Sequence, residues 1–192
     1  MNSGKIKFKT FNTFCNHFIF NRYMIVIRIL LKFRKLINKV CEFGCNDMKF
    51  FPHMKNGVKH LQQIAMVDID DTILKRFKER ASPMLCDYLN KREVPLRVDI
   101  FKGSVSKPNP HLVGFDAVIG IELIEHVFPD VLDEIPFHIF SYMNPKIVIF
   151  TTPNCEFNVL FPDMVKFRHD DHKFEWSRAE FQDWYDVLCS VI

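Results

Sequence analysis

Phe115-Asp-Ala-Val-Ile-Gly-Ile-Glu-Leu-Ile-Glu-His-Val127 is the stretch of sequence that decides the fold. Its apolar run, Ala117 to Ile121, predicts a buried strand. Glu122, Glu125 and His126 follow at the spacing i, i+3, i+4, which predicts three ligand-type side chains on one helical face. Because ligands bind at the carboxyl edge of open α/β sheets, this cluster is a candidate metal or catalytic site. The alternative is a solvated helix start, where the helix dipole favours acidic residues.

Strand-like and helical segments alternate along the rest of the chain. Strands are predicted at residues 40–43, 63–69, 94–101, 115–121 and 146–152. Helices are predicted from Tyr23 onward, at residues 72–80 and 82–91, and from Glu122 past Pro129 to a bend at Pro136. A last helix opens with a capping box, Ser177 to Glu180. The alternation predicts an α/β protein with a right-handed, doubly wound, mostly parallel sheet.

Length and composition describe one globular domain. A chain of 192 residues, 48% hydrophobic and 26% charged, buries one good core and is neither fibrous nor disordered as a whole. Its six cysteines include no Cys-x-x-Cys pair, which fits reduced intracellular thiols. Arg22 and Arg28 interrupt the apolar stretch at residues 18–33, so neither a bilayer span nor a signal peptide is predicted. The expected location is the cytoplasm, with the nucleus as the alternative.

The net charge of +3 hides an uneven distribution. Residues 1–41 hold nine Lys/Arg and no acid, so the remaining residues carry 17 basic and 23 acidic side chains, a balance of −6. We expect residues 1–20 to be a basic, disordered extension and residues 21–192 to form the folded domain. Such an arm can contact RNA phosphates or an anionic membrane surface, and a purely solvated extension is the alternative.

Ligand-type residues end several of the predicted strands. Gly44 follows the first strand, where glycine allows a close backbone approach to a nucleotide-type ligand. Asp68 lies 24 residues after Gly44, close to the spacing at which a carboxylate binds a ribose hydroxyl in nucleotide-binding α/β units. A parallel sheet would bring both residues to the same rim as Ser104, Glu122 and Thr151.

Several blocks of the sequence resemble a known enzyme family. Val40-Cys-Glu-Phe-Gly-Cys45, Val67-Asp-Ile-Asp70 and Phe115-Asp-Ala-Val-Ile119 resemble class I S-adenosylmethionine-dependent methyltransferases. Three further blocks resemble a more specific family, the small RNA 3′-terminal 2′-O-methyltransferases of the Hua-enhancer type. These blocks are Ile121-Glu-Leu-Ile-Glu-His126, Thr151-Thr-Pro-Asn-Cys-Glu-Phe-Asn158 and Asp171-His-Lys-Phe-Glu-Trp-Ser-Arg178. The resemblance covers residues 22–185. It implies methyl transfer from S-adenosylmethionine to the 2′-hydroxyl of the last nucleotide of a small RNA.

The resemblance also implies a divalent metal site. In this family the ion is Mg²⁺ or Mn²⁺, and its four ligands correspond here to Glu122, Glu125, His126 and His172. The resemblance further implies that the ion binds the 2′- and 3′-hydroxyls of an unblocked RNA end. Carboxylate oxygen and imidazole nitrogen suit such an ion, and a bound cation lowers the pKa of a coordinated hydroxyl. His126 or His172 is expected to be the general base.

The family resemblance assigns a cofactor site and partners as well. Four residues are expected to bind S-adenosylmethionine: Glu42 and Gly44 in the first turn, Asp68 at the ribose and Ser104 near the adenine. Arg22 and Tyr23 resemble an Arg-Tyr pair that lies close to the site in this family, and the alternative is ordinary helix surface and core. The implied partners are the small RNA 3′ end and a small-RNA-carrying Argonaute/Piwi-type protein.

Two features depart from the family pattern. Asn46 stands where the first turn has a second glycine; asparagine tolerates positive φ, but its side chain is expected to crowd the methionine tail. The chain ends at Ile192, before the sixth and seventh strands of this fold, so we expect a C-terminally shortened domain with an exposed sheet edge.

The loop before the last helix has two interpretations. We read His169 and Asp170 as loop surface and expect Asp171 to orient an imidazole. Phe174 and Trp176 either stack on a terminal base or belong to the core.

Two other functions stay open at this point. One is a small-molecule methyltransferase in which Glu122, Glu125 and His126 bind no metal. The other is a truncated, inactive protein that retains RNA or partner contacts.

Overall fold

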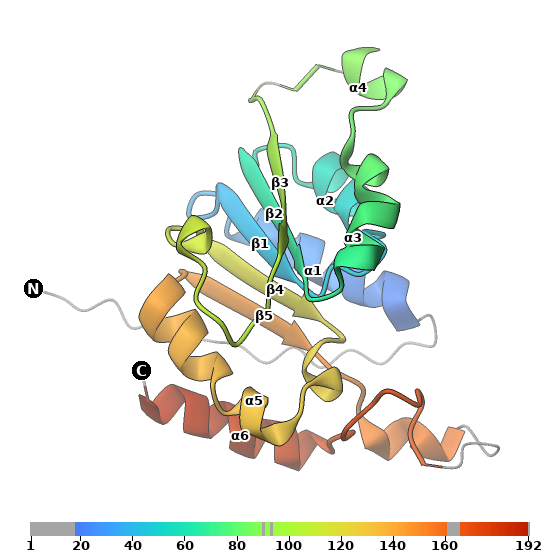
Figure 1. Ribbon diagram of the computed structural model, residues 1–192, viewed down its shortest axis with the longest axis vertical. Helices are drawn as coiled ribbons and strands as arrows, with labels where there is room; N and C mark the ends of the chain where they lie inside the picture. The colour runs from blue at the N-terminus through green and yellow to red at the C-terminus, as the bar shows by residue number, and fades with distance from the viewer. Residues whose placement is uncertain (1–17, 90, 93, 161–165, 192) are drawn as a thin grey trace, which may run out of the picture.

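An all-parallel sheet of five strands forms the centre of the molecule (Figure 1). The computed structural model describes residues 18–89, 91, 92, 94–160 and 166–191. The strands are β1 (Lys39–Phe43), β2 (Gln63–Asp68), β3 (Arg97–Lys102), β4 (Ala117–Ile121) and β5 (Ile147–Thr151). Their order in the sheet is β3-β2-β1-β4-β5. The predicted doubly wound α/β fold is therefore confirmed.

The sheet changes direction at β1, which pairs with β2 on one side and with β4 on the other. The chain moves outward from β1 through β2 to β3 and returns to the other side of β1 for β4 and β5. Such a reversal leaves a crevice between the loops that follow the two central strands. The turn at Gly44 and the turn at Glu122 therefore face the same ligand-binding edge.

Helices cover both faces of the sheet. The α-helices are α1 (Phe18–Lys32), α2 (Phe51–Gly57), α3 (Asp71–Phe77), α4 (Leu85–Leu89), α5 (Pro129–Leu132) and α6 (Arg178–Val191). Shorter helical turns cover Lys78–Ala81, Pro110–Leu112, Ile124–His126, Phe137–Met143 and Cys155–Leu160. Figure 1 shows α1, α2 and α3 on one side of the sheet and α5 and α6 on the other. None of the helices within the described ranges is long and apolar enough to cross a membrane.

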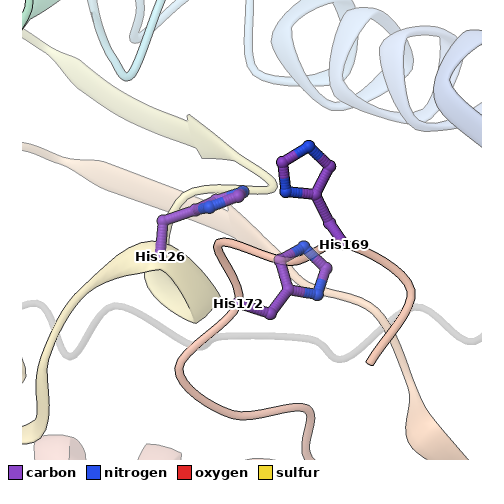
Figure 2. Close-up of side chains that lie close together, drawn as sticks. All are labelled: His126, His169 and His172. Atoms are coloured by element: carbon purple, nitrogen blue, oxygen red, sulfur yellow. The ribbon is translucent and has the colours of Figure 1, made fainter. Parts of the chain in front are cut away.

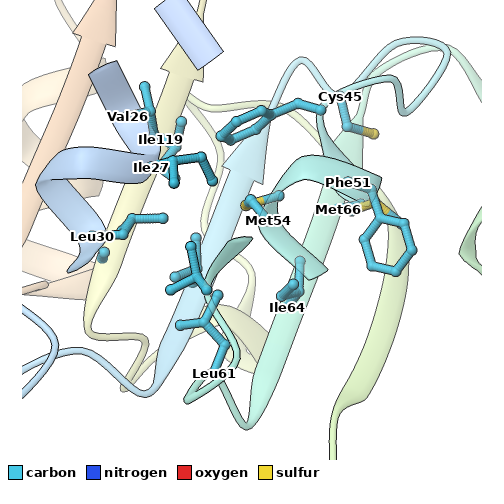
Figure 3. Packing of buried hydrophobic residues seen from close by; sticks show 14 of the residues in the cluster. Val26, Ile27, Leu30, Cys45, Phe51, Met54, Leu61, Ile64, Met66 and Ile119 are labelled. Carbon is cyan, nitrogen blue, oxygen red and sulfur yellow. The ribbon is translucent and has the colours of Figure 1, made fainter. Parts of the chain in front are cut away.

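The core beneath α1 and α2 shows why the first helix forms (Figure 3). Val26, Ile27 and Leu30 lie on one face of α1 and are buried against Met54 of α2 and Ile119 of β4. The predicted amphipathic helix thus packs on the sheet, because its apolar stripe has a sheet face to cover. It begins at Phe18, five residues before the predicted start.

The second core lies on the opposite face of the sheet. Val118 of β4 belongs to this second cluster although its neighbours along the strand, Ala117 and Ile119, belong to the first. Successive side chains of a strand point to opposite faces, so β4 is apolar throughout because helices cover both sides. Phe181 and Trp184 of α6 pack against this second core.

Several predicted element boundaries are wrong for local reasons. Asp70 caps α3 by accepting the backbone N–H groups of Thr72 at 2.8 Å and Ile73 at 3.3 Å, so this helix starts at Asp71. The helix predicted at residues 82–91 is only the short α4, because Ser82 has extended dihedral angles. Of the predicted disordered extension, residues 1–17 lie outside the described part, and residues 18–20 belong to α1.

Glu42 is a buried carboxyl group in the middle of the sheet. Its side chain is 4% exposed, and its Oε2 atom has no hydrogen-bond partner among the residues described. Burial raises the pKa of Glu42 to about 8, and the nearby charges of Asp68 and Asp47 add to the shift. The folded state therefore keeps this group protonated at neutral pH.

Replacing Glu42 by glutamine should stabilise the fold at pH 8 but not at pH 5. The pKa of Glu42 in the folded state lies above the ordinary value of about 4.5. The contribution of Glu42 to the stability of the wild-type protein is therefore fully present at low pH and is lost as the pH rises toward 8. We expect Glu42→Gln to raise the free energy of unfolding by roughly 2–4 kcal/mol at pH 8 and by less than about 1 kcal/mol at pH 5. Urea denaturation at both pH values measures the free energy of unfolding of the variant and of the wild-type protein. The exposed Glu134→Gln variant is the control, and an equal gain at both pH values would contradict the assignment.

Candidate functional site

The turn after β4 differs from the predicted helix. Glu122 has a φ of 51°, in the left-handed region, and only Ile124–His126 form a helical turn, of 3₁₀ type. The backbone N–H of Glu122 donates to the Thr151 carbonyl at 3.0 Å and to the Thr151 hydroxyl at 3.2 Å. The prediction that Glu122, Glu125 and His126 share one helical face is wrong, because the bond to β5 holds Glu122 outside the turn.

Glu122 lies between a cation and a hydroxyl. Its Oε2 atom forms an ion pair with the Arg22 guanidinium of α1 at 2.5 Å, and the Thr151 hydroxyl donates to its Oε1 atom at 3.3 Å. Burial raises the pKa of Glu122 to about 7, although Arg22 and Thr151 both favour the ionised form. The contact gives Arg22 a role at the site, as its resemblance to the family pair implied.

Glu125 is the most deeply buried acid of this edge. Its side chain is 0% exposed, and neither carboxylate oxygen has a hydrogen-bond partner in the described part of the chain. Burial and, to a smaller extent, the charge of Glu122 raise the pKa of Glu125 to about 8, although the nearby Thr152 hydroxyl favours the ionised form. A buried carboxylate without a partner is costly unless it is protonated or binds a cation. Glu125 therefore fits a metal ligand.

Three histidines lie close to one another at this edge of the sheet (Figure 2). His126 ends the turn after β4, whereas His169 and His172 come from the loop before α6. The ring centroids of His126 and His172 are 4.8 Å apart, and the His169 centroid is 5.7 Å from each of the other two. One nitrogen from each ring lies within 4.8 Å of the others. The backbone N–H of Lys173 donates to the Glu125 carbonyl at 2.7 Å, which holds this loop against the turn.

Carboxylates orient two of the imidazoles. The Nδ1 atom of His126 lies 3.1 Å from Asp171 Oδ2, and the Nδ1 atom of His172 lies 2.6 Å from Glu175 Oε1. An Nδ1–H that donates to a carboxylate leaves Nε2 unprotonated, ready to bind a metal or accept a proton. The predicted role of Asp171 in orienting an imidazole is confirmed. Burial lowers the pKa of His126, although the bond to Asp171 opposes the shift, so this ring is neutral at pH 7.

A buried network behind His172 was missed by the sequence analysis. Burial would raise the pKa of Glu175, but the Asn158 amide at 2.7 Å, the Arg168 backbone N–H at 2.7 Å and His172 lower it. The Arg168 guanidinium also donates to Asn158 Oδ1 at 2.7 Å and to the Asn154 carbonyl at 2.6 Å. No spacing in the sequence indicates this network, because its members come from two separate turns.

The structure brings the predicted metal ligands together in two pairs. His126 and His172 share the histidine group, and Glu122 and Glu125 lie close enough to affect each other's pKa. Neither glutamate belongs to the group of three imidazoles. Carboxylate and imidazole donors together suit a divalent cation, and the unpartnered oxygens of Glu125 provide a reason for one to bind here.

The predicted cofactor residues line the neighbouring part of the rim. Gly44 has a φ of 69°, and a Cβ atom there would lie 2.8 Å from Leu123 Cδ1, so this turn favours glycine. Asn46 takes up the left-handed φ of 44°, and its backbone N–H donates to Asp68 Oδ2 at 2.8 Å. Asp68 Oδ1 accepts the backbone N–H of Asp70 at 2.9 Å, which fixes the carboxylate beside the turn.

Ser104 lies just beyond the end of β3. Its hydroxyl is 3.0 Å from the Ser106 hydroxyl, and the preceding Gly103 N–H donates to the Asp68 carbonyl at 2.9 Å. These bonds place Ser104 on the same side of the rim as Asp68. Of the four predicted cofactor residues, Glu42 lies within β1, Asp68 ends β2, and Gly44 and Ser104 lie in the turns after β1 and β3.

The aromatic residues of the loop belong to the core rather than to the surface. The rings of Phe174 and Trp176 stack with centroids 4.2 Å apart, and Trp176 contacts Trp184 of α6 with centroids 5.5 Å apart. Ser177 and Glu180 form the predicted capping box, with the Ser177 N–H 2.8 Å from Glu180 Oε2 and the Glu180 N–H 3.3 Å from Ser177 Oγ. The structure thus favours the core alternative for Phe174 and Trp176.

Known proteins resemble this chain in sequence and in fold. No family model matches the chain. A small RNA 2′-O-methyltransferase of Drosophila melanogaster is 46% identical over 170 residues, which is 85% of this chain and 43% of that protein. A small RNA 2′-O-methyltransferase of Gallus gallus is 40% identical over 163 residues, with coverage of 85% and 43%. The chain thus spans less than half the length of these curated relatives.

Solved structures show the same relationship. The methyltransferase domain of bacterial CtHen1-C has 30% sequence identity and a TM-score of 0.70, and the match covers 88% of this chain and 82% of that one. The small RNA methyltransferase HEN1 has 27% identity and a TM-score of 0.77, with coverage of 95% and 23%. By sequence and fold, the chain belongs to the Hen1-type small RNA 2′-O-methyltransferase family, within the class I S-adenosylmethionine-dependent methyltransferases.

Proposed function

We propose that this chain transfers the methyl group of S-adenosylmethionine to the 2′-hydroxyl of the 3′-terminal nucleotide of small RNAs, assisted by a divalent ion. The observation that carries the proposal is Glu125, a fully buried carboxylate without a hydrogen-bond partner in the described ranges, directly before His126, which belongs to a group of three imidazoles. The names of the relatives supply the RNA substrate and the 2′-hydroxyl. The Argonaute/Piwi-type partner stays a prediction.

The cofactor would bind across the ends of β1, β2 and β3. Gly44 lets the methionine part approach the backbone, and the Asp68 carboxylate would accept hydrogen bonds from the ribose hydroxyls. Ser104 would lie near the adenine. Glu42, protonated at neutral pH, would offer an O–H donor beneath the first turn without placing a second negative charge there.

The ion would be held between the two pairs of ligands. Glu122 and Glu125 supply carboxylate oxygen, while His126 and His172 supply Nε2 lone pairs, a set that suits Mg²⁺ or Mn²⁺. When bound, the ion supplies Lewis-acid assistance that lowers the pKa of a coordinated hydroxyl. The Arg22 guanidinium, now paired with Glu122, offsets part of the negative charge that the carboxylates place at this edge.

The reaction needs one proton acceptor. His126 and His172 each keep Nδ1–H on a carboxylate, which leaves one lone pair, on Nε2. A ring that binds the ion through Nε2 cannot accept a proton there, so the ring that takes the proton of the 2′-hydroxyl would do so with its Nε2 free of the ion. The 2′-oxygen then forms a bond to the methyl carbon while the bond from that carbon to the cofactor sulfur breaks, which leaves S-adenosylhomocysteine. Asp171 and Glu175 would stabilise the imidazolium that forms.

Methylation should require both an unblocked RNA end and a divalent ion. We expect a small RNA with free 2′- and 3′-hydroxyls to become resistant to periodate after incubation with the protein, S-adenosylmethionine and Mn²⁺. Addition of EDTA should abolish the resistance, and excess Mn²⁺ should restore it. The control is a small RNA with a 2′-deoxy end, on which methylation is measured by the transfer of radiolabelled methyl. Transfer that continues undiminished in EDTA would refute metal assistance and would favour a metal-free methyltransferase.

Replacing Glu125 by glutamine should separate metal binding from cofactor binding. The amide keeps the size of the protonated side chain but cannot provide a carboxylate ligand, so we expect Mn²⁺ affinity and methylation to fall about tenfold to hundredfold. Calorimetry should show S-adenosylmethionine affinity within about twofold of wild type, because Gly44 and Asp68 are unchanged. The Glu134→Gln variant, on an exposed side chain, should match wild type in both assays. Unchanged Mn²⁺ affinity in Glu125→Gln would remove Glu125 from the ligand set.

Metal binding should release protons below pH 8. The raised pKa values of Glu122 and Glu125, about 7 and about 8, mean that the metal-free protein holds protons that a cation must displace. We therefore expect the Mn²⁺ dissociation constant to fall about tenfold or more from pH 6.5 to pH 8.5 and to level off above that range. Calorimetry in buffers of different ionisation enthalpy counts the released protons. A dissociation constant independent of pH over this range would contradict the burial of these carboxyls in the functional state.

A further inference from the structure

His169 is the one member of the histidine group that the predicted ligand set does not use. The side chain is exposed, and its ring lies at equal centroid distances, 5.7 Å, from His126 and His172. A nitrogen of His169 lies within 4.8 Å of a nitrogen of each of the other two rings.

Hydrogen bonds determine which nitrogen of His169 is unprotonated. The backbone N–H of Asp171 donates to His169 Nδ1 at 3.1 Å, so Nδ1 carries a lone pair and the neutral ring holds its proton on Nε2. His126 and His172 show the opposite arrangement, with Nδ1–H on carboxylates and lone pairs on Nε2. Figure 2 shows the His169 ring with one nitrogen directed toward His126 and His172. Each ring thus has one fixed lone pair.

Asp171 links two of these rings. Its carboxylate holds His126 in place, and its backbone N–H holds His169. The backbone N–H of His172 donates to the His169 carbonyl at 3.1 Å, so His169, Asp171 and His172 form one tight turn. A single turn of the chain therefore positions two imidazoles and orients the third.

We propose that His169 binds the divalent ion through Nδ1, as a third imidazole beside His126 and His172. This inference rests on the proposed metal-assisted function and extends its ligand set. With metal–nitrogen bonds of about 2.0–2.2 Å, two ligating nitrogens lie at most about 4.4 Å apart, so separations of up to 4.8 Å close by side-chain shifts of less than about 1 Å. On binding, the ion would replace the Asp171 N–H as the partner of the His169 Nδ1 lone pair.

A third imidazole changes the donor set toward nitrogen. Three nitrogen ligands and buried carboxylates suit a borderline cation such as Mn²⁺, Co²⁺ or Zn²⁺ better than the hard Mg²⁺, which prefers oxygen. Co²⁺ is therefore a suitable probe, because its visible absorption bands respond to the number and type of its ligands. The probe reports on binding without any need for RNA or for turnover.

Co²⁺ titration of the purified chain tests the assignment, with visible absorption as the readout. We expect His169→Ala to weaken Co²⁺ binding by about tenfold or more and to shift the visible bands, and His172→Ala to do the same. Asp170→Asn, an exposed neighbour in the same turn, should bind like wild type and serves as the matched control. Circular dichroism establishes that each variant is folded.

A second variant covers the case in which His169→Ala disturbs the turn. His169→Cys places a thiol at this position, and a thiolate bound to Co²⁺ gives an intense near-ultraviolet charge-transfer band. We expect that band in the variant and not in wild type. Wild-type affinity and bands in His169→Ala, together with no charge-transfer band in His169→Cys, would overturn the role of His169 and leave the proposed function intact. Failure of wild-type protein to bind Co²⁺ or Mn²⁺ would overturn both.

Discussion

The parallel pairing of β1 with β4 is the constraint on which the site depends. These two strands are far apart in the sequence, yet their pairing, from Val40 with Ala117 to Phe43 with Gly120, places the turns after both strands side by side. The turn after β1 contributes Gly44 and is hydrogen-bonded to the Asp68 carboxylate at the end of β2, and the turn after β4 contributes carboxylates and imidazole. A methyl donor and an acceptor hydroxyl held over the two turns would therefore meet at the switch point of the sheet.

Buried acids give this edge its chemistry and also its cost in stability. Glu42, Glu122 and Glu125 have raised pKa values because the sheet and its covering helices exclude water. Arg22 reaches Glu122 from α1, so that acid has a protein partner, whereas Glu125 has none among the residues described. A divalent cation would satisfy Glu125, and the loop of His169 to Glu175 is tied to the same turn by the Lys173 bond. Metal binding and loop position are therefore expected to depend on each other.

Much of the fold could be predicted because its signals are local. Apolar runs at residues 40–43, 63–69 and 115–121 indicated buried strands, and the observed strands differ from them by at most two residues at either end. The predicted helix at residues 82–91 was wrong because Ser82 has extended dihedral angles. The predicted helical face at Glu122 was wrong because the hydrogen bond to Thr151 of β5 decided the backbone there. Asn46 at a glycine position proved compatible with the turn, since asparagine adopts the left-handed conformation that the turn requires.

The sequence by itself determined the fold class, the family resemblance and the types of residue at the site, because periodicity and motif spacing are properties of the chain. Only the tertiary structure decided how those residues meet. It paired His126 with Asp171 and His172 with Glu175, left Glu125 without a partner in the described part of the chain, and turned His169 from expected loop surface toward the other imidazoles. The physical reason is that lone-pair direction and burial depend on contacts between distant segments, which no local pattern specifies.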